Sequence, residues 1–92
     1  MEPVVAKLVT FEGSVQGVGF RYTANSLAWR FNVTGYVMNM PNGSVEIHAE
    51  GPVDEVDCFI DAVKTEMAEY IQEVKTQPVP AAAQYRRFSV RF

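Results

Sequence analysis

The chain has 92 residues, of which 48% are hydrophobic and 21% charged, and its formal net charge is −3. This length predicts a single domain over residues 1–92, and the mixed composition excludes a disordered chain. One cysteine excludes a disulfide framework or a thiolate metal site, and no apolar run approaches the roughly 20 residues that a membrane-spanning helix needs.

The first third of the chain predicts a strand, a loop and a helix. Val4 to Glu12 is rich in β-branched and apolar residues, which favours a buried strand. Gly13 to Gly19 holds three glycines and is expected to be a loop. A helix is expected from about Tyr22 to Phe31. Its apolar stripe, spaced i, i+3, i+4 and i+7, consists of Ala24, Leu27, Ala28 and Phe31.

The middle of the chain predicts a hairpin. Gly35 to Met40 is the second expected strand, and Pro41-Asn42-Gly43 is a tight turn because Asn-Gly readily takes positive φ angles. In the third expected strand, Ser44 to Glu50, apolar and polar residues alternate, which predicts one face on the core and one in water. The apolar set is Val45, Ile47 and Ala49, and the polar set is Ser44, Glu46, His48 and Glu50.

The last part of the chain predicts a second helix and further strands. Gly51-Pro52 breaks the chain before a helix whose first turn carries Asp54 and Glu55, where acidic side chains suit the helix dipole. The expected buried stripe of this helix is Val56, Phe59, Ile60, Val63 and Met67. Tyr70 to Thr76 is the fourth expected strand and Gln77 to Gln84 a loop. The alternation of Phe88, Val90 and Phe92 predicts a final strand.

The resulting order is β-α-β-β-α-β, with an extra short strand near the end. Two right-handed crossovers that place both helices on one face of an antiparallel sheet give a ferredoxin-like α+β sandwich. That is the fold class we expect, and a fold of this kind leaves the function open.

An anion site is one interpretation of the first loop. No Asp or Glu lies between Gly13 and Val45, where the only charges are Arg21 and Arg30. Successive N–H groups of a glycine-rich loop that enters a helix can converge on an anion, and Arg21 can bind a phosphate with two hydrogen bonds. A structural turn with a surface arginine explains the same residues. Asn39, late in the second expected strand, is open to the same two interpretations.

Two segments resemble the signatures of the acylphosphatase family. The first is Gly13-x-Val15-Gln16-Gly17-Val18-x-Phe20-Arg21, and the second is Gly35-Tyr36-Val37-Met38-Asn39-x-x-x-Gly43-x-Val45, followed by Gly51. The two segments cover residues 13–51, and the length and element order of the remainder also resemble the family.

The resemblance implies hydrolysis of the carboxyl–phosphate bond of small acyl phosphates, without a metal or cofactor. It implies that Arg21 and the backbone amides of one loop hold the phosphate, and that Asn39 orients the attacking water. The loop residues are Val15, Gln16, Gly17, Val18, Gly19 and Phe20. The chemistry fits these roles because an acyl phosphate expels a carboxylate, whose conjugate acid has a pKa of roughly 4. Since no Asp, Glu or His lies between Gly13 and Val45, we expect a phosphate oxygen of the substrate to accept the proton of the water.

The chain departs from the common family pattern at a few positions. Ser14 and Met38 stand where basic residues are frequent, which predicts weaker substrate binding. Phe11 and the pair Met67-Ala68 also differ from the usual residues.

Several chemically reactive residues are expected to have structural roles only. His48 is expected to be a solvated surface histidine and Cys58 a partly buried thiol. Arg86, Arg87 and Arg91 are expected to be solvated flanks of the last strand.

Two alternatives come from other function classes. A nucleic-acid-binding module of this fold uses aromatic side chains on the open sheet face, but this chain has acidic residues there and a negative net charge. The other alternative is a noncatalytic or accessory anion-binding domain, because acylphosphatase-like domains also occur inside larger hydrogenase-maturation proteins. We therefore expect a small acyl phosphate as the partner, with no nucleic acid and no membrane. A monomer is the simplest expectation. The reducing cytosol is the default compartment, because the chain has one cysteine and its start lacks signal-peptide features.

Overall fold

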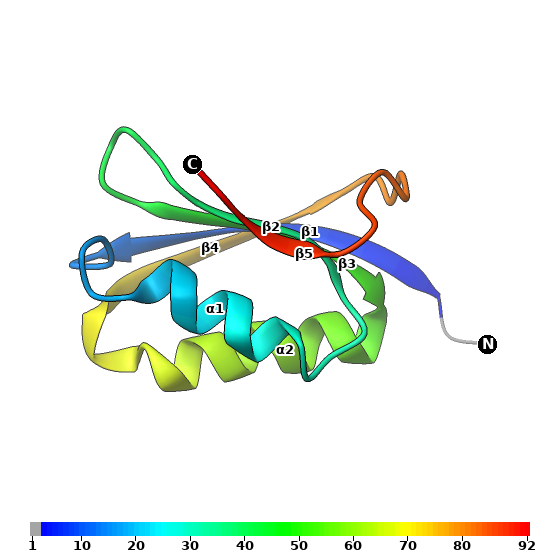
Figure 1. Cartoon of the computed structure of the whole chain (residues 1–92), viewed down its shortest axis with the longest axis horizontal. Coiled ribbons are helices and arrows are strands. Elements are labelled where there is room, and N and C mark those ends of the chain that lie inside the picture. The colour runs from blue at the N-terminus through cyan, green and yellow to red at the C-terminus, as the bar shows by residue number, and fades with distance from the viewer. Residues whose placement is uncertain (1–2) are drawn as a thin grey trace.

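The computed structural model describes residues 3–92, in which both helices pack on one face of a five-stranded sheet (Figure 1). Along the chain the α-helices and strands are β1 (Val4–Gly13), α1 (Phe20–Ala28), β2 (Thr34–Asn39), β3 (Val45–Pro52), α2 (Val53–Glu66), β4 (Ile71–Val79) and β5 (Phe88–Arg91). A short 3-10 helix, η1 (Ala68–Tyr70), connects α2 to β4. In residues 3–92, neither helix has both the length and the apolar character required to cross a bilayer.

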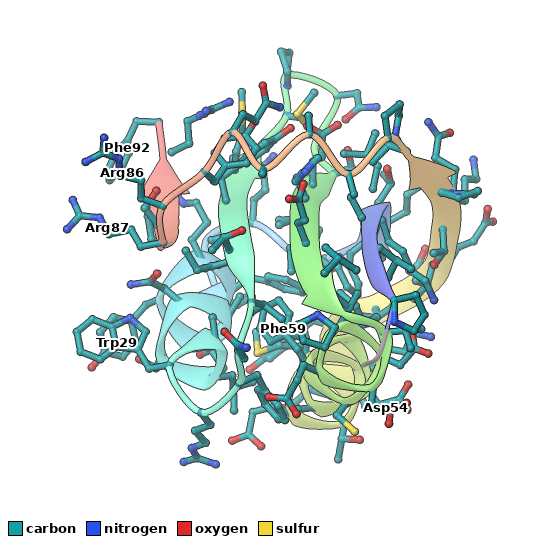
Figure 2. The ribbon with its side chains drawn as sticks, turned by 90° about the vertical axis from the view of Figure 1, so that its right-hand side faces the viewer. Trp29, Asp54, Phe59, Arg86, Arg87 and Phe92 are labelled. Atoms are coloured by element: carbon teal, nitrogen blue, oxygen red, sulfur yellow. The ribbon has the colours of Figure 1, made fainter. Side chains whose placement is uncertain are left out.

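The strands lie in the order β4-β1-β3-β2-β5, and Figure 2 shows this order from right to left across the sheet. β1 pairs antiparallel with β3 and β4, and β2 pairs antiparallel with β3. The extra strand, β5, pairs parallel with β2, with Gly35 opposite Phe88 and Met38 opposite Arg91. The ferredoxin-like α+β fold class is therefore confirmed, and the parallel pairing of β5 makes the sheet mixed.

The hydrophobic core lies between the sheet and the helices. Phe59 of α2 is fully buried there, and its ring centroid lies 6.1 Å from that of Phe31 and 5.1 Å from that of Phe88 (Figure 2). The expected stripe of α2 is confirmed, because Val56, Phe59, Ile60, Val63 and Met67 are all buried. Three of the four residues predicted for the stripe of α1 are buried, and Phe31 is partly buried against the core.

Helix α1 begins and ends earlier than the sequence predicts. Gly19 adopts the left-handed conformation at the N-cap, with φ of 79°, so the helix begins at the next residue, Phe20. At the other end, the N–H of Arg30 donates to the carbonyl of Leu27 and the N–H of Phe31 donates to that of Ala28. Bonds of this i to i+3 type tighten the last turn and end the α-helix at Ala28.

The sheet face opposite the helices is covered, which corrects the prediction of a solvated polar face on β3. The segment 80–87, here called the crossing segment, passes over this face between β4 and β5 (Figure 2). The N–H of Ala83 donates to Glu50 Oε2 at 2.8 Å, and the ring of Tyr85 lies 5.0 Å from that of His48. His48 is therefore only 7% exposed, and the prediction of a solvated histidine is wrong.

Cys58 is exposed, so the prediction of a partly buried thiol is also wrong. It follows the buried Val56 by two positions on α2, and two residues along an α-helix turn the side chain by more than half a revolution. Arg86 and Arg87 are exposed as expected. Arg91 is exposed as well, and its guanidinium lies over the ring of Tyr36, with Cζ 4.2 Å from the ring centroid.

Candidate active site

One cavity joins the glycine-rich loop, the start of α1, the end of β2 and the last residues of the chain. Its volume is about 330 Å³. It is lined by Val15, Gly17, Gly19, Phe20, Arg21, Tyr22, Asn25, Asn39, Val90 and Phe92. Six of the residues that the sequence analysis selects are in this lining, namely Val15, Gly17, Gly19, Phe20, Arg21 and Asn39.

The φ angles of the loop alternate in sign, as they do in an anion-binding nest. Gly17 and Gly19 have φ angles of 78° and 79°, and Val18 between them keeps a negative φ. A Cβ at either glycine would meet no atom within 4 Å, so glycine is favoured at these positions by the positive φ angle and not by a lack of space for a side chain. Alternation between left-handed and right-handed residues turns successive N–H groups toward one point.

The N-terminus of α1 continues this row of donors. The first intrahelical bond runs from the N–H of Thr23 to the carbonyl of Gly19, so the N–H groups of Phe20, Arg21 and Tyr22 precede the helical ladder. The first turn carries no acidic side chain and Gly19 offers no side-chain cap. No acidic side chain of the first turn therefore offsets the partial positive charge of the helix end.

Gln16 and Val18 belong to the loop but do not line the cavity. Gln16 Nε2 donates to the carbonyl of Met40 at 2.8 Å and to that of Ser44 at 2.9 Å. Val18 is partly buried against the core. The side chain of Gln16 thus joins the loop to the turn that follows β2, and Val18 packs the loop against the core.

Strand alternation explains the position of Asn39. Val37 points into the core on the helix side of the sheet, and Asn39, two positions later, lies on the same side. Its partner across the ladder is Val45, which is fully buried. Asn39 therefore lines the same 330 Å³ cavity as Arg21 and the residues of the loop.

The sequence analysis missed four lining residues, which are Tyr22, Asn25, Val90 and Phe92. Asn25 follows Arg21 by one helical turn, a spacing that could have indicated a shared face. Its Oδ1 is buried and makes no hydrogen bond within residues 3–92. Phe92 lies beside the guanidinium of Arg21, with Cζ 4.8 Å from the ring centroid. The parallel register of β5, which brings Val90 and Phe92 here, has no short-range sequence signal.

Ser14 and Met38, the positions without the basic residues common in the family, lie outside the cavity. Ser14 lines a separate depression with Glu12 and Asn42. Met38 is paired with Glu46 in the sheet and alternates with Asn39, so it belongs to the opposite face. Any effect of these two residues on an anion in the cavity would therefore act at longer range than a direct contact.

A second polar cluster lies under the crossing segment, on the sheet face away from the cavity. The hydroxyl of Tyr36 donates to Glu46 Oε2 at 2.7 Å, and burial together with this bond raises the pKa of Tyr36. Burial lowers the pKa of His48, with the nearby carboxylates of Glu50 and Glu46 opposing that shift. This cluster contributes no side chain to the cavity. Within residues 3–92, no group of three or more His, Cys, Asp or Glu residues is arranged to hold a metal ion.

Comparisons with known proteins give a consistent result. The family model described as Acylphosphatase matches residues 7–90. An acylphosphatase of Pediococcus pentosaceus is 58% identical over 52 residues, which are 56% of this chain and 58% of the relative. An acylphosphatase of Lactobacillus johnsonii is 39% identical over 80 residues, which are 85% of this chain and 88% of the relative.

Solved structures with a similar fold also include acylphosphatases. The crystal structure of acylphosphatase from Bacillus subtilis superimposes with a TM-score of 0.85 at 30% identity, covering 96% of this chain and 99% of that chain. The alignment with the Pediococcus pentosaceus relative, by contrast, spans little more than half of that protein's length.

Proposed function

The chain belongs to the acylphosphatase family, and from that membership we propose that it hydrolyses acyl phosphates to a carboxylate and inorganic phosphate. The observation that carries the proposal is the shared cavity. Arg21, Asn39 and four residues of the loop line it together. A guanidinium, an amide and backbone donors are the three parts that the proposed reaction needs.

The phosphoryl group would lie in the nest. Its equatorial oxygens carry negative charge throughout the reaction, and fixed N–H donors with a guanidinium stabilise that charge without reorganising. Gly17 and Gly19 supply the backbone conformation, and Arg21 supplies the planar donor pair that suits two phosphate oxygens.

Asn39 would hold the attacking water in line with the leaving group. An amide can accept a hydrogen bond from water and donate another to it, which fixes the water oxygen near the phosphorus. The water oxygen forms the new bond to phosphorus while the bond from phosphorus to the acyl oxygen breaks, and the bonding pair leaves with the carboxylate.

The proton balance needs no enzyme base. None of the residues that line the cavity is Asp, Glu or His. A proton of the water therefore passes to a phosphoryl oxygen, and the products are a carboxylate and dihydrogen phosphate. The leaving carboxylate needs no protonation, since its conjugate acid has a pKa of roughly 4, and the proposed reaction runs without a metal.

Turnover of benzoyl phosphate in the presence of EDTA tests this proposal. We expect activity in the parent protein and a loss of about 100-fold or more in kcat for Arg21→Ala and for Asn39→Ala. Arg30→Ala and Asn32→Ala, which change exposed residues outside the cavity, serve as matched controls and should keep parental activity. Full activity of Arg21→Ala or Asn39→Ala would contradict the assigned roles. A folded parent protein without turnover would favour the noncatalytic anion-binding alternative.

A further inference from the structure

The cavity has two chemically different parts. One part contains the loop and the guanidinium, which suit an anion. The other part of the lining contains three largely apolar side chains, Tyr22 on α1, Val90 on β5 and Phe92 directly after β5. An acyl phosphate has the same two parts, a phosphoryl group and an acyl group joined through one oxygen.

Two of these three side chains, those of Tyr22 and Phe92, are exposed, whereas Val90 is partly buried. Among the described residues, four large hydrophobic side chains are mostly exposed, and two of the four line this cavity. Phe92 is 94% exposed and Tyr22 is 77% exposed. Figure 2 shows Phe92 at the β5 edge of the sheet, on the outside of the molecule, whereas Phe59 lies inside the core. Ligand contact with such rings removes apolar surface from water and is favourable.

The position of Phe92 places this surface beside the reacting group. Its ring centroid lies 4.8 Å from Cζ of Arg21. If Arg21 holds the phosphoryl oxygens, the acyl group bonded to that phosphoryl must begin within a few ångströms of the guanidinium. The ring of Phe92 is then an apolar surface beside that acyl group, and Val90 lines the same cavity.

The charges around the cavity disfavour an acyl group that carries its own anion. Arg21 is the one Lys or Arg in the lining. Arg86 and Arg87 line a different depression, with Trp29 at the end of α1. A second carboxylate or phosphate on the acyl group would therefore lack a cationic partner in the described part of the site and would lose hydration against Phe92.

We propose that Tyr22, Val90 and Phe92 form the acyl-binding wall of the site and make it selective for uncharged apolar acyl groups, aromatic ones above all. This inference rests on the proposed acyl phosphate hydrolysis. The wall determines which acyl group is turned over, whereas the nest and Asn39 act on the phosphoryl group that all acyl phosphates share.

The experiment compares kcat/KM for benzoyl phosphate and acetyl phosphate in the parent protein and in the variants Phe92→Ala and Tyr22→Ala. Release of inorganic phosphate measures both reactions in the same way. We expect each variant to reduce the ratio of benzoyl to acetyl kcat/KM by about five- to tenfold, since loss of apolar contact is felt by the larger acyl group. Trp29→Ala is the matched control, because Trp29 is an aromatic residue of the α1 end that is 81% exposed and outside this cavity.

Two further measurements separate selectivity from the positioning of Arg21. Phe92→Leu keeps an apolar side chain but loses the ring beside the guanidinium, and should keep most of the parental ratio. If Phe92 acted only by positioning Arg21, Phe92→Ala would lower both substrates equally and leave the ratio unchanged. An unchanged ratio in both alanine variants, in a protein that Arg21→Ala inactivates, overturns this inference and leaves the proposed hydrolysis standing. A parent protein inactive on both substrates overturns both.

Discussion

The clamp made by Gln16 is the feature whose removal tests the site geometry most directly. Its Nε2 donates to the carbonyls of Met40 and Ser44, so one side chain joins the anion loop to the turn after Asn39. Gln16→Ala removes both hydrogen bonds without changing any residue in the lining of the cavity.

The expected loss of stability follows from the partners that remain. The carbonyl of Met40 still accepts from the N–H of Gly43, and that of Ser44 still accepts from the N–H of Met40. No carbonyl is left unpaired, so each lost bond costs only its net value, and the total is about 1–2 kcal/mol. For a domain of this size, that loss lowers the melting temperature by about 5–10 °C.

The expected loss of activity is larger than the loss of stability suggests. The loop and Asn39 must hold the phosphoryl group and the water in one line, and a displacement of about 1 Å can cost on the order of 100-fold in rate. We therefore expect kcat for benzoyl phosphate to fall about ten- to 100-fold in Gln16→Ala. Gln16→Glu should bind inorganic phosphate more weakly than Gln16→Ala, because the new carboxylate adds a negative charge beside the nest.

Urea unfolding and steady-state kinetics with benzoyl phosphate are the assays. Gln84→Ala, an exposed glutamine in the crossing segment, is the matched control and should change stability by less than about 0.5 kcal/mol. If Gln16→Ala unfolds at the parental urea concentration and keeps parental kcat, the clamp has no part in holding the site together.

Three further predictions concern stability. Phe59→Ala removes a fully buried ring from the centre of the core and should lower the unfolding free energy by about 3–5 kcal/mol in urea unfolding, with Phe59→Leu losing less. Burial holds the pKa of His48 in the folded protein below its ordinary value of 6.5, so the unfolded chain takes up the proton first and the free energy of unfolding should fall as the pH drops below about 6.5. The difference in unfolding free energy between pH 7.5 and pH 5.5 should be smaller in His48→Gln than in the parent protein, and equal differences would count against this reasoning. Gly35→Ala should prevent folding, since φ is 136° and its Cβ would overlap the carbonyl oxygen of His48, whereas Gly43→Ala meets no atom within 4 Å and should cost only about 1–2 kcal/mol by circular-dichroism melts.

Periodicity in the sequence predicts the fold well where one element faces one core. The stripe of α2 and the alternation of Val45, Ile47 and Ala49 follow directly from the periods of helix and strand, and the structure buries all of these residues. The same reasoning failed for His48. Alternation predicts which residues share a face, but it does not predict that a distant segment such as 80–87 covers that face.

The candidate site divides in the same way. The loop, Arg21 and Asn39 could be selected from local motifs, because glycine spacing and the helix start are local properties. Phe92 and Val90 could not, because they reach the cavity only through the parallel pairing of β5 with β2. The roles assigned to these residues, the monomeric state and the cytosolic location remain predictions.

The position of β5 beside β2 also affects how the cavity forms while the protein folds during synthesis. During synthesis the loop and Asn39 leave the ribosome well before residues 88–92, and pairing between sequence-distant strands is slow to form. The cavity therefore gains its final wall only when the sheet is complete. Turnover of a bulky acyl phosphate would then report on the finished sheet, while a nascent chain without β5 would hold the loop and helix N-terminus with one side open to solvent.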